Sequence, residues 1–145
     1  MPLLKFTPAD IQKSKLLDDA WYGASIKSCS DWIPAKPNPP KPPSLNMTIT
    51  LVIEGQADKE IEYLINNTGM GFHVAFFAAV LGIPIKKIQD EPSLLETFDT
   101  DTLPGKKVDV HVIQDNFLGR MNNKPASGGF LPYGKGRGQQ ANSVY

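Results

Sequence analysis

Residues 45–81 read LNMTITLVIEGQADKEIEYLINNTGMGFHVAFFAAVL and contain three local patterns in succession. Apolar and polar residues alternate over 45–54 and again over 59–66, which is the period of half-buried strands. Residues 55–58 break the alternation, so the two strands are predicted to form a hairpin. Over 68–81 the apolar residues recur at helical spacing instead, which predicts one helix with an apolar stripe.

The predicted helix has clear end signals. Asn67 or Thr68 can supply the N-cap side chain, and Gly82 followed by Pro84 ends the helix. A second, short helix is predicted at residues 92–98, because proline suits a first helical turn.

Strand patterns also flank this central region. Residues 21–32 mix aromatic, β-branched and small side chains, and we expect a first strand there with Trp21 in the core and Tyr22 facing outward. Residues 107–114 alternate again, and an irregular last strand is predicted within 120–132.

The order is therefore strand, strand, strand, helix, strand, strand. This order predicts a mainly β fold: a five-stranded OB-type Greek-key barrel with one helix between strands three and four. An α+β sandwich with the helix on one face has the same order, and the sequence leaves that alternative open.

The composition is that of one globular domain that needs no disulfide bond or structural metal ion. The chain has 145 residues, of which 41% are hydrophobic and 21% are charged, enough to bury a core. One cysteine excludes an internal disulfide, and two histidines are too few for most metal sites. No apolar run approaches the roughly 20 residues of a membrane span, and no signal peptide is visible.

Charge and sequence bias are unevenly distributed. Lys and Arg number 15 and Asp and Glu number 15, but residues 117–145 contain four basic residues and no acid. Residues 34–44 read PAKPNPPKPPS and predict an extended loop. We expect a domain over 1–133 and a flexible, Gly-rich basic tail over 134–145.

Several motifs occur together along residues 18–133. Trp21, Tyr22 and Gly23 open the first strand, TGMGFHVAFFAAVLGIP forms the helical region, and DTDTLPGKKVDVHVIQDNFLGRMNN follows it. The motif residues in the second half are Phe98, Leu103, Gly105, Lys106, Gly119, Arg120, Asn122, Asn123, Phe130, Leu131 and Pro132. In these features the chain resembles small bacteriophage proteins that are predicted to be OB-fold single-stranded DNA-binding proteins.

The resemblance implies largely sequence-independent binding of single-stranded DNA in phage DNA replication or recombination. It implies that the protein is located in the cytoplasm of the bacterial host. It also implies that replication or recombination proteins are further partners and that the protein self-associates into a homodimer. No enzymatic activity, cofactor, metal or membrane contact is expected. Many single-stranded DNA-binding proteins end in an acidic tail that recruits partners, whereas this chain ends in a basic one.

Binding of single strands requires cations that follow the phosphates and aromatic rings that stack on the bases. In an OB fold these groups lie on strands two and three and on the loops between strands one and two and between four and five. The candidate contact residues are Tyr22, Lys27, Trp32, Lys36, Lys41, Lys106, Lys107, Phe117, Arg120, Phe130, Tyr133, Lys135 and Arg137.

Structural roles compete with several of these assignments. Trp32 can pack on the neighbouring prolines, and Phe130 and Tyr133 can close the barrel seam. Lys106 and Lys107 can serve as a charged strand edge that blocks aggregation. The DNA-binding hypothesis requires a closed sheet and a groove without carboxylates. An OB-like module that binds an acidic host or replisome protein is the alternative, favoured by the zero net charge.

Residues that could support catalysis are few. His111 and Asp109 form an i, i+2 pair on one predicted strand face, but no nucleophile accompanies them. Asp99 and Asp101 could bind a divalent ion, although alternating Asp and Thr is equally typical of an exposed loop. Cys29 is expected to be a small buried residue. The sequence therefore does not predict an enzyme.

Overall fold

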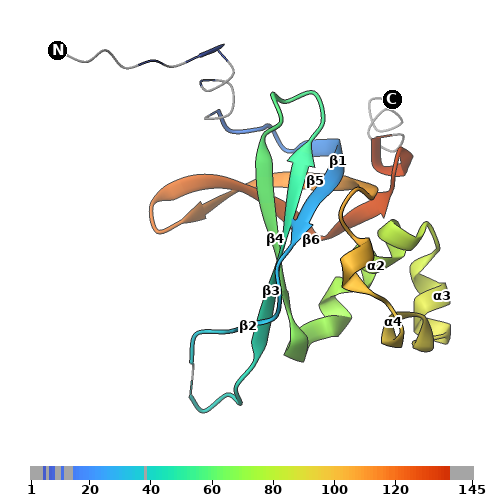
Figure 1. The fold of residues 1–145 in the computed structure, drawn as a ribbon. Helices are drawn as coiled ribbons and strands as arrows, with labels where there is room; N and C mark the ends of the chain where they lie inside the picture. The colour runs from blue at the N-terminus through green and yellow to red at the C-terminus, as the bar shows by residue number, and fades with distance from the viewer. Residues whose placement is uncertain (1–4, 6, 9–10, 12–14, 38, 138–145) are drawn as a thin grey trace.

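The structure is a computed structural model that describes residues 5, 7–8, 11, 15–37 and 39–137. Within this part the protein is mainly β, with one sheet of six strands and helices packed at one side (Figure 1). The strands are β1 (Ala20–Cys29), β2 (Ile33–Pro34), β3 (Leu45–Ile53), β4 (Glu60–Asn66), β5 (Lys107–Phe117) and β6 (Arg120–Pro132). The helices between β4 and β5 are η1 (Asn67–His73), α2 (Val74–Leu81), α3 (Ile85–Asp90), α4 (Ser93–Glu96) and η2 (Thr100–Thr102). Among the described residues, none of these helices has the length and apolarity needed to cross a bilayer.

All neighbouring strands of the sheet are antiparallel. They follow the order β2-β3-β1-β5-β6, and β4 pairs with the other edge of β3. β4 and β6 are thus the two ends of the sheet, and no backbone ladder joins them in the described part of the chain. The mainly β prediction is confirmed, but the sheet is not closed, so the five-stranded barrel is not confirmed.

The two ends of the sheet nevertheless meet through aromatic side chains. The ring of Tyr63 on β4 lies 4.7 Å from that of Phe130 on β6, measured between centroids. Both rings also contact Phe76 of α2, at 5.1 Å each. Phe130 is only 2% exposed. A ring buried in this way cannot stack on a nucleobase, so Phe130 is removed from the candidate contact residues.

The alternation of β1 sets which of its side chains reach the core. Ala24 and Ile26 are buried, so the even-numbered positions up to this point face inward. Tyr22, opposite Val110, packs against the core, whereas Trp21 lies opposite His111 on the other face. The predicted orientation of Trp21 and Tyr22 is therefore wrong, because it reversed the two faces of the strand.

The predicted helix over residues 68–81 is divided into two pieces. The 3-10 helix η1 leads into α2, and Gly69 has a non-helical backbone (φ −125, ψ 37) inside η1. The cap comes from Asn66, one residue before the predicted positions, whose side chain accepts from the Thr68 N–H. Gly82 ends α2 in the left-handed region (φ 71), as predicted.

More short helices are present than the sequence predicted. α4 lies inside the predicted short helix over 92–98, but α3 was not expected. α3 has only six residues and buries one of them, Ile88, so its sequence shows little amphipathic periodicity. α2 is different: it buries Ala75, Phe76, Phe77, Ala78 and Ala79 against the sheet.

The last two strands form a long hairpin that extends beyond the rest of the sheet (Figure 1). β5 reaches Phe117, further than predicted, and the turn is made by Leu118 and Gly119, both at positive φ. The pairing shifts opposite His111, between the pairs Val110–Phe130 and Val112–Pro125. This irregularity confirms the predicted irregular last strand.

The base of the hairpin holds the segment that precedes β1. The Asn123 side chain accepts from the Leu17 N–H at 2.7 Å and donates to the Leu17 carbonyl at 2.9 Å. Leu17 is itself buried in the core. These hydrogen bonds therefore fix the segment before β1 to the β5–β6 hairpin.

Candidate nucleic-acid interface

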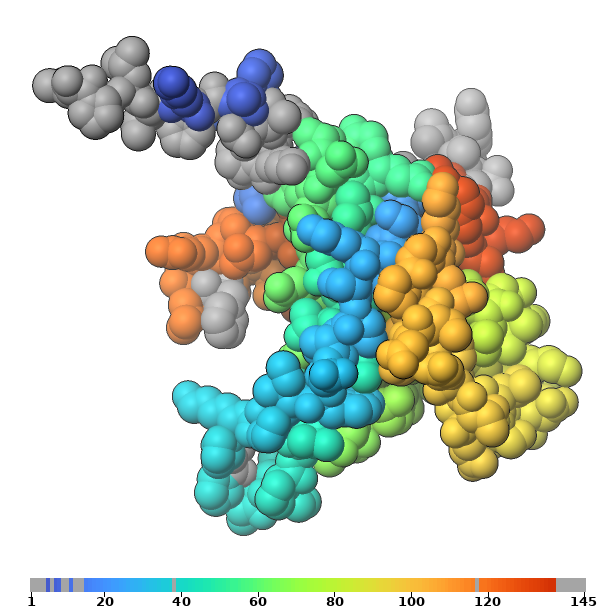
Figure 2. Space-filling model, viewed as in Figure 1, coloured from blue at the N-terminus to red at the C-terminus, as the bar shows by residue number. Residues whose placement is uncertain are grey.

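Two arms project from the sheet on the side away from α3 and α4 (Figure 1). One is the Pro-rich loop, residues 34–44, which carries Lys36 and Lys41. The other is the tip of the β5–β6 hairpin, which carries Arg120. All three side chains are exposed, and none of them forms an ion pair with any residue that the structure describes. Figure 2 shows a recess between the two arms.

The outward faces of β1, β3 and β4 belong to the same side of the sheet, and we call them the arm face. Its residues are Lys27, Thr48, Thr50, Glu60, Glu62 and Leu64. Leu64 is 54% exposed. Lys27 pairs with Glu60 at 3.2 Å, which leaves Glu62 without an ion-pair partner among the described residues. The groove is thus not free of carboxylates, contrary to the requirement stated from the sequence.

Three other candidate contact residues meet at a different place, which we call the Glu54 cluster. The Tyr133 hydroxyl donates to the Glu54 carboxylate at 2.7 and 2.8 Å. The Lys107 ammonium and the Arg137 guanidinium lie 5.3 and 4.5 Å from the centre of the Tyr133 ring. Both cations also lie near Glu54, at 3.7 and 3.8 Å. Intramolecular partners therefore already neutralise these two cations.

Arg137 is held most firmly by Asp109, which was predicted to be on a polar strand face. Asp109 is fully buried, and its carboxylate accepts from the Arg137 backbone N–H at 2.8 Å and from its Nε at 3.2 Å. Hydrogen bonds to Tyr133 and to Asp109 raise the pKa of Arg137. Asp109 and His111 lie at alternate positions on one face of β5, as predicted, but Asp109 is not at the surface, because the chain after β6 covers it.

Two glycines permit this covering. A Cβ on Gly136 would overlap the ring of Trp21, and one on Gly23 would lie 2.7 Å from the Glu54 carboxylate. Trp21 in turn stacks on His111 at 5.2 Å between ring centroids. The expected flexible tail spans 134–145; of its residues, Gly136 and Arg137 pack against the sheet, and 138–145 lie outside the described residues.

The remaining candidates have different surroundings. The Tyr22 hydroxyl donates to the Asp18 carbonyl at 2.9 Å, and burial raises the pKa of Tyr22. Lys106 is half-buried and Lys135 is exposed. The side chain of Phe117 is outside what the structure describes, so its assignment stays a prediction.

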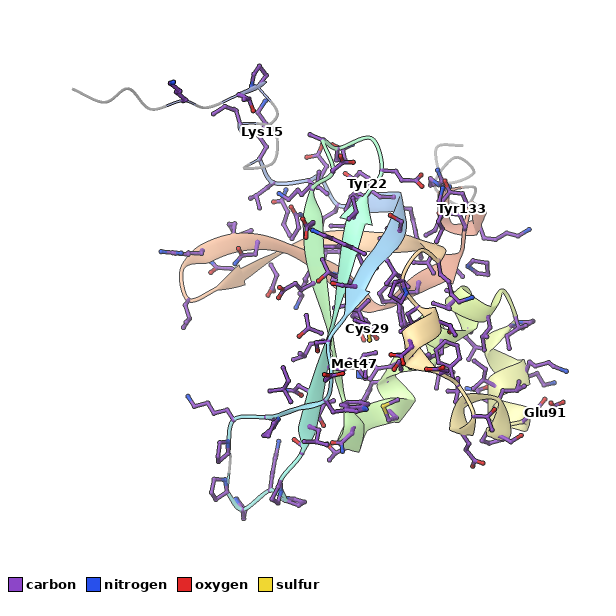
Figure 3. The ribbon with its side chains drawn as sticks, viewed as in Figure 1. Lys15, Tyr22, Cys29, Met47, Glu91 and Tyr133 are labelled. Carbon is purple, nitrogen blue, oxygen red and sulfur yellow. The ribbon has the colours of Figure 1, made fainter. Side chains whose placement is uncertain are left out.

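Trp32 stands at the root of the Pro-rich loop and is 39% exposed. Its ring lines an apolar pocket of about 230 Å³ on the helix side, together with Met47, Phe77, Leu95, Phe98 and Thr100. Figure 3 shows Met47 beside Cys29 near the middle of the molecule, with Glu91 far away at its edge. The sequence did not reveal this pocket, because its walls come from four separate segments.

One hydrogen-bonded pair was also missed. The Tyr63 hydroxyl and His73 Nδ1 are 2.5 Å apart, burial raises the pKa of Tyr63, and burial lowers that of His73. Both groups are therefore neutral at neutral pH, and the pair joins β4 to the end of η1. No group of His, Cys, Asp and Glu among the described residues is arranged to hold a metal ion.

Cys29 gives a testable pH dependence. Its Sγ lies 3.1 Å from the Met47 sulfur. Burial raises the pKa of the thiol, and the negative charges of Asp101 and Asp31 raise it further. Only the thiolate reacts with disulfide reagents, so a raised pKa lowers the reactive fraction at neutral pH. We expect slower reaction with a coloured aromatic disulfide than in urea-unfolded protein, with the rate rising to higher pH. Asp101→Asn should accelerate it, and equal native and unfolded rates at pH 7 would refute this.

Comparison with known proteins assigns no family. No family model matches the sequence, and a search of curated proteins finds no match. The two arms and the arm face between them are therefore the features from which a function can be inferred.

Proposed function

We propose that the protein binds single-stranded DNA, largely without sequence preference, along the arm face and between the two arms. This proposal replaces the closed, carboxylate-free groove required from the sequence by an open face that carries one unbalanced carboxylate, Glu62. The observation that carries this proposal is the placement of Lys36 and Lys41 on one arm and Arg120 on the other. All three are exposed cations without ion pairs in the described chain. They project beside the outward face of β1, β3 and β4, and an OB fold binds oligonucleotides on the corresponding strands and loops.

The strand order supports an OB-type reading of the sheet. β4 and β6 are the ends that an OB barrel would join, and here Tyr63, Phe76 and Phe130 pack across that junction. We propose a barrel that is closed by side chains at this junction. The resemblance to phage proteins then suggests a role in phage DNA replication or recombination in the bacterial host.

The arms and the sheet surface between them have distinct tasks in the proposed DNA site. The three arm cations contact phosphates, and the prolines keep the two lysines extended because their φ angles are fixed. The exposed apolar side chains of Ile33 and Leu64 lie under the bases. Binding is then mostly electrostatic, with log K falling by about 0.7 per phosphate for each unit of log salt.

The acidic residues of the arm face set a limit on affinity. Glu60 is neutralised by Lys27, but Glu62 places an unbalanced negative charge beside the path of the phosphates. Changing Glu62 therefore offers a gain-of-binding test. We expect Glu62→Lys to tighten binding several-fold at low salt and to steepen the salt slope by up to about 0.7.

The test is fluorescence anisotropy of a labelled oligo-dT at several salt concentrations. Combining Lys36→Ala, Lys41→Ala and Arg120→Ala should flatten the salt slope by about 2, since up to three phosphate contacts are lost. Lys86→Ala is the matched control, because Lys86 is an exposed lysine of α3. Competition with double-stranded DNA and RNA measures the preference for single-stranded DNA.

The result that overturns the proposal is absence of an anisotropy change at low salt. A wild-type slope that the triple variant leaves unchanged would equally refute the arms as the contact site. The first result would favour the alternative from the sequence, in which the Pro-rich loop and the basic tail bind an acidic protein partner. The second would place the DNA contact on another surface of the protein.

A further inference from the structure

The apolar pocket beside Trp32 is not used by the proposed DNA site. It lies at one end of the sheet, where Met47 of β3 meets Phe77 of α2 and Leu95 of α4. The arms leave the sheet on the other side (Figure 1). The two surfaces come next to each other at the root of the Pro-rich loop, where Trp32 of the pocket precedes Ile33.

The size and lining of the pocket favour one bulky apolar group. Its volume of about 230 Å³ is below the roughly 300–1,000 Å³ of sites for drug-sized molecules. Aromatic walls from Trp32, Phe77 and Phe98, with the adaptable thioether of Met47, suit an aromatic or long aliphatic side chain. Thr100 is the single hydroxyl in the lining.

Four carboxylates are next in sequence to residues that line this pocket. All four are exposed: Asp31, Glu96, Asp99 and Asp101. Asp31 and Asp101 both act on the thiol of Cys29, and that thiol touches the lining residue Met47, so these two charges are close to the pocket. None of the four forms an ion pair with a described residue. Such a rim repels phosphodiesters and attracts lysine and arginine.

We propose that this pocket binds a short peptide segment of a partner protein, with one bulky apolar side chain inserted and Lys or Arg on either side. The inserted side chain is buried beside Trp32, and the flanking cations pair with the acidic rim. Partner recruitment then occurs through an acidic rim within the folded domain, independently of the chain after β6. This inference goes beyond DNA binding and does not depend on it.

The probe is a fluorescein-labelled peptide, Gly-Lys-Arg-Phe-Leu-Lys-Gly, measured by anisotropy with the full chain. Replacing its Phe and Leu by Ser should weaken binding at least about tenfold, since one buried apolar side chain contributes that much. Replacing its three cations by Glu should abolish binding. On the protein, Asp31→Lys with Asp101→Lys should also weaken binding at least about tenfold.

Two further variants separate the pocket from its surroundings. Thr100→Trp places a ring in the cavity and should abolish peptide binding while the circular dichroism spectrum is unchanged. Glu62→Lys, a matched charge reversal on the arm face, should leave peptide affinity unchanged. The surface variants at Asp31 and Asp101 keep the test decisive if the filled pocket destabilises the fold.

Three outcomes would overturn the inference. The first is equal affinity for the Phe-Leu and Ser-Ser peptides, which would indicate charge attraction alone. The second is peptide binding that survives a folded Thr100→Trp variant. The third is displacement of the peptide by oligo-dT, which would assign the pocket to nucleic acid. Failure of DNA binding itself is detected separately, by the oligonucleotide titration.

Discussion

Phe130→Ala is expected to lower the free energy of unfolding by about 3–5 kcal/mol, the range for truncating a buried aromatic ring. Phe130 is 2% exposed and contacts Tyr63 and Phe76 at centroid distances of 4.7 and 5.1 Å. Truncation removes a ring at the point where the two ends of the sheet and α2 meet. The cavity would then lie between β4 and β6, which no backbone ladder joins. Backbone hydrogen bonds between these two strands therefore cannot compensate for the lost ring contacts.

Urea denaturation followed by circular dichroism measures this effect. Phe130→Leu keeps most of the volume and should cost less than about 1.5 kcal/mol. Leu118→Ala at the 88% exposed hairpin tip is the control, and should change stability by no more than about 0.5 kcal/mol. A loss below about 1 kcal/mol in Phe130→Ala would show that the ring does not join the sheet ends.

The elements that the sequence predicted well are those whose signal is local. β3 and β4 could be placed from alternation alone, because each strand buries every second residue. Gly82 could be assigned as a helix end, because its left-handed backbone is a local requirement. α3 and the division of the predicted long helix could not be foreseen, since α3 packs by one buried side chain.

The errors at the candidate site have a common physical cause. Burial of Phe130 and Asp109 depends on partners distant in sequence: Tyr63 and Phe76 pack on Phe130, and Arg137 reaches Asp109 across 28 positions. A basic residue identified from sequence is a candidate phosphate contact only until its counter-ion is known. Lys36, Lys41 and Arg120 remain candidates, whereas Lys107 and Arg137 already have acidic partners.

Asp109→Ala is expected to lower the free energy of unfolding by about 2–3 kcal/mol, the range for hydrogen bonds to a buried charged group. Asp109 is fully buried and receives both the backbone N–H and the Nε of Arg137. Its loss leaves the Arg137 backbone donor without this acceptor and frees the chain after β6 from Trp21 and His111. Arg137→Ala should cost less, about 1 kcal/mol, because that side chain is 39% exposed and solvent screens its charge.

A double-mutant cycle between Asp109→Ala and Arg137→Ala measures the pair itself. We expect a coupling of about 1 kcal/mol, whereas Lys135→Ala, two residues before Arg137 and exposed, should show none with Asp109→Ala. Additive effects at Asp109 and Arg137 would contradict the contact.

The same variants distinguish a structural from a DNA-binding role for the Glu54 cluster. Because Asp109 and Glu54 already balance Arg137, Arg137→Ala should leave the salt slope of oligo-dT binding unchanged. If the slope falls by about 0.7 instead, Arg137 exchanges its acidic partners for a phosphate when DNA binds. In that case the strand would extend from the arm face to the end of β6, and the Glu54 cluster would be part of its path.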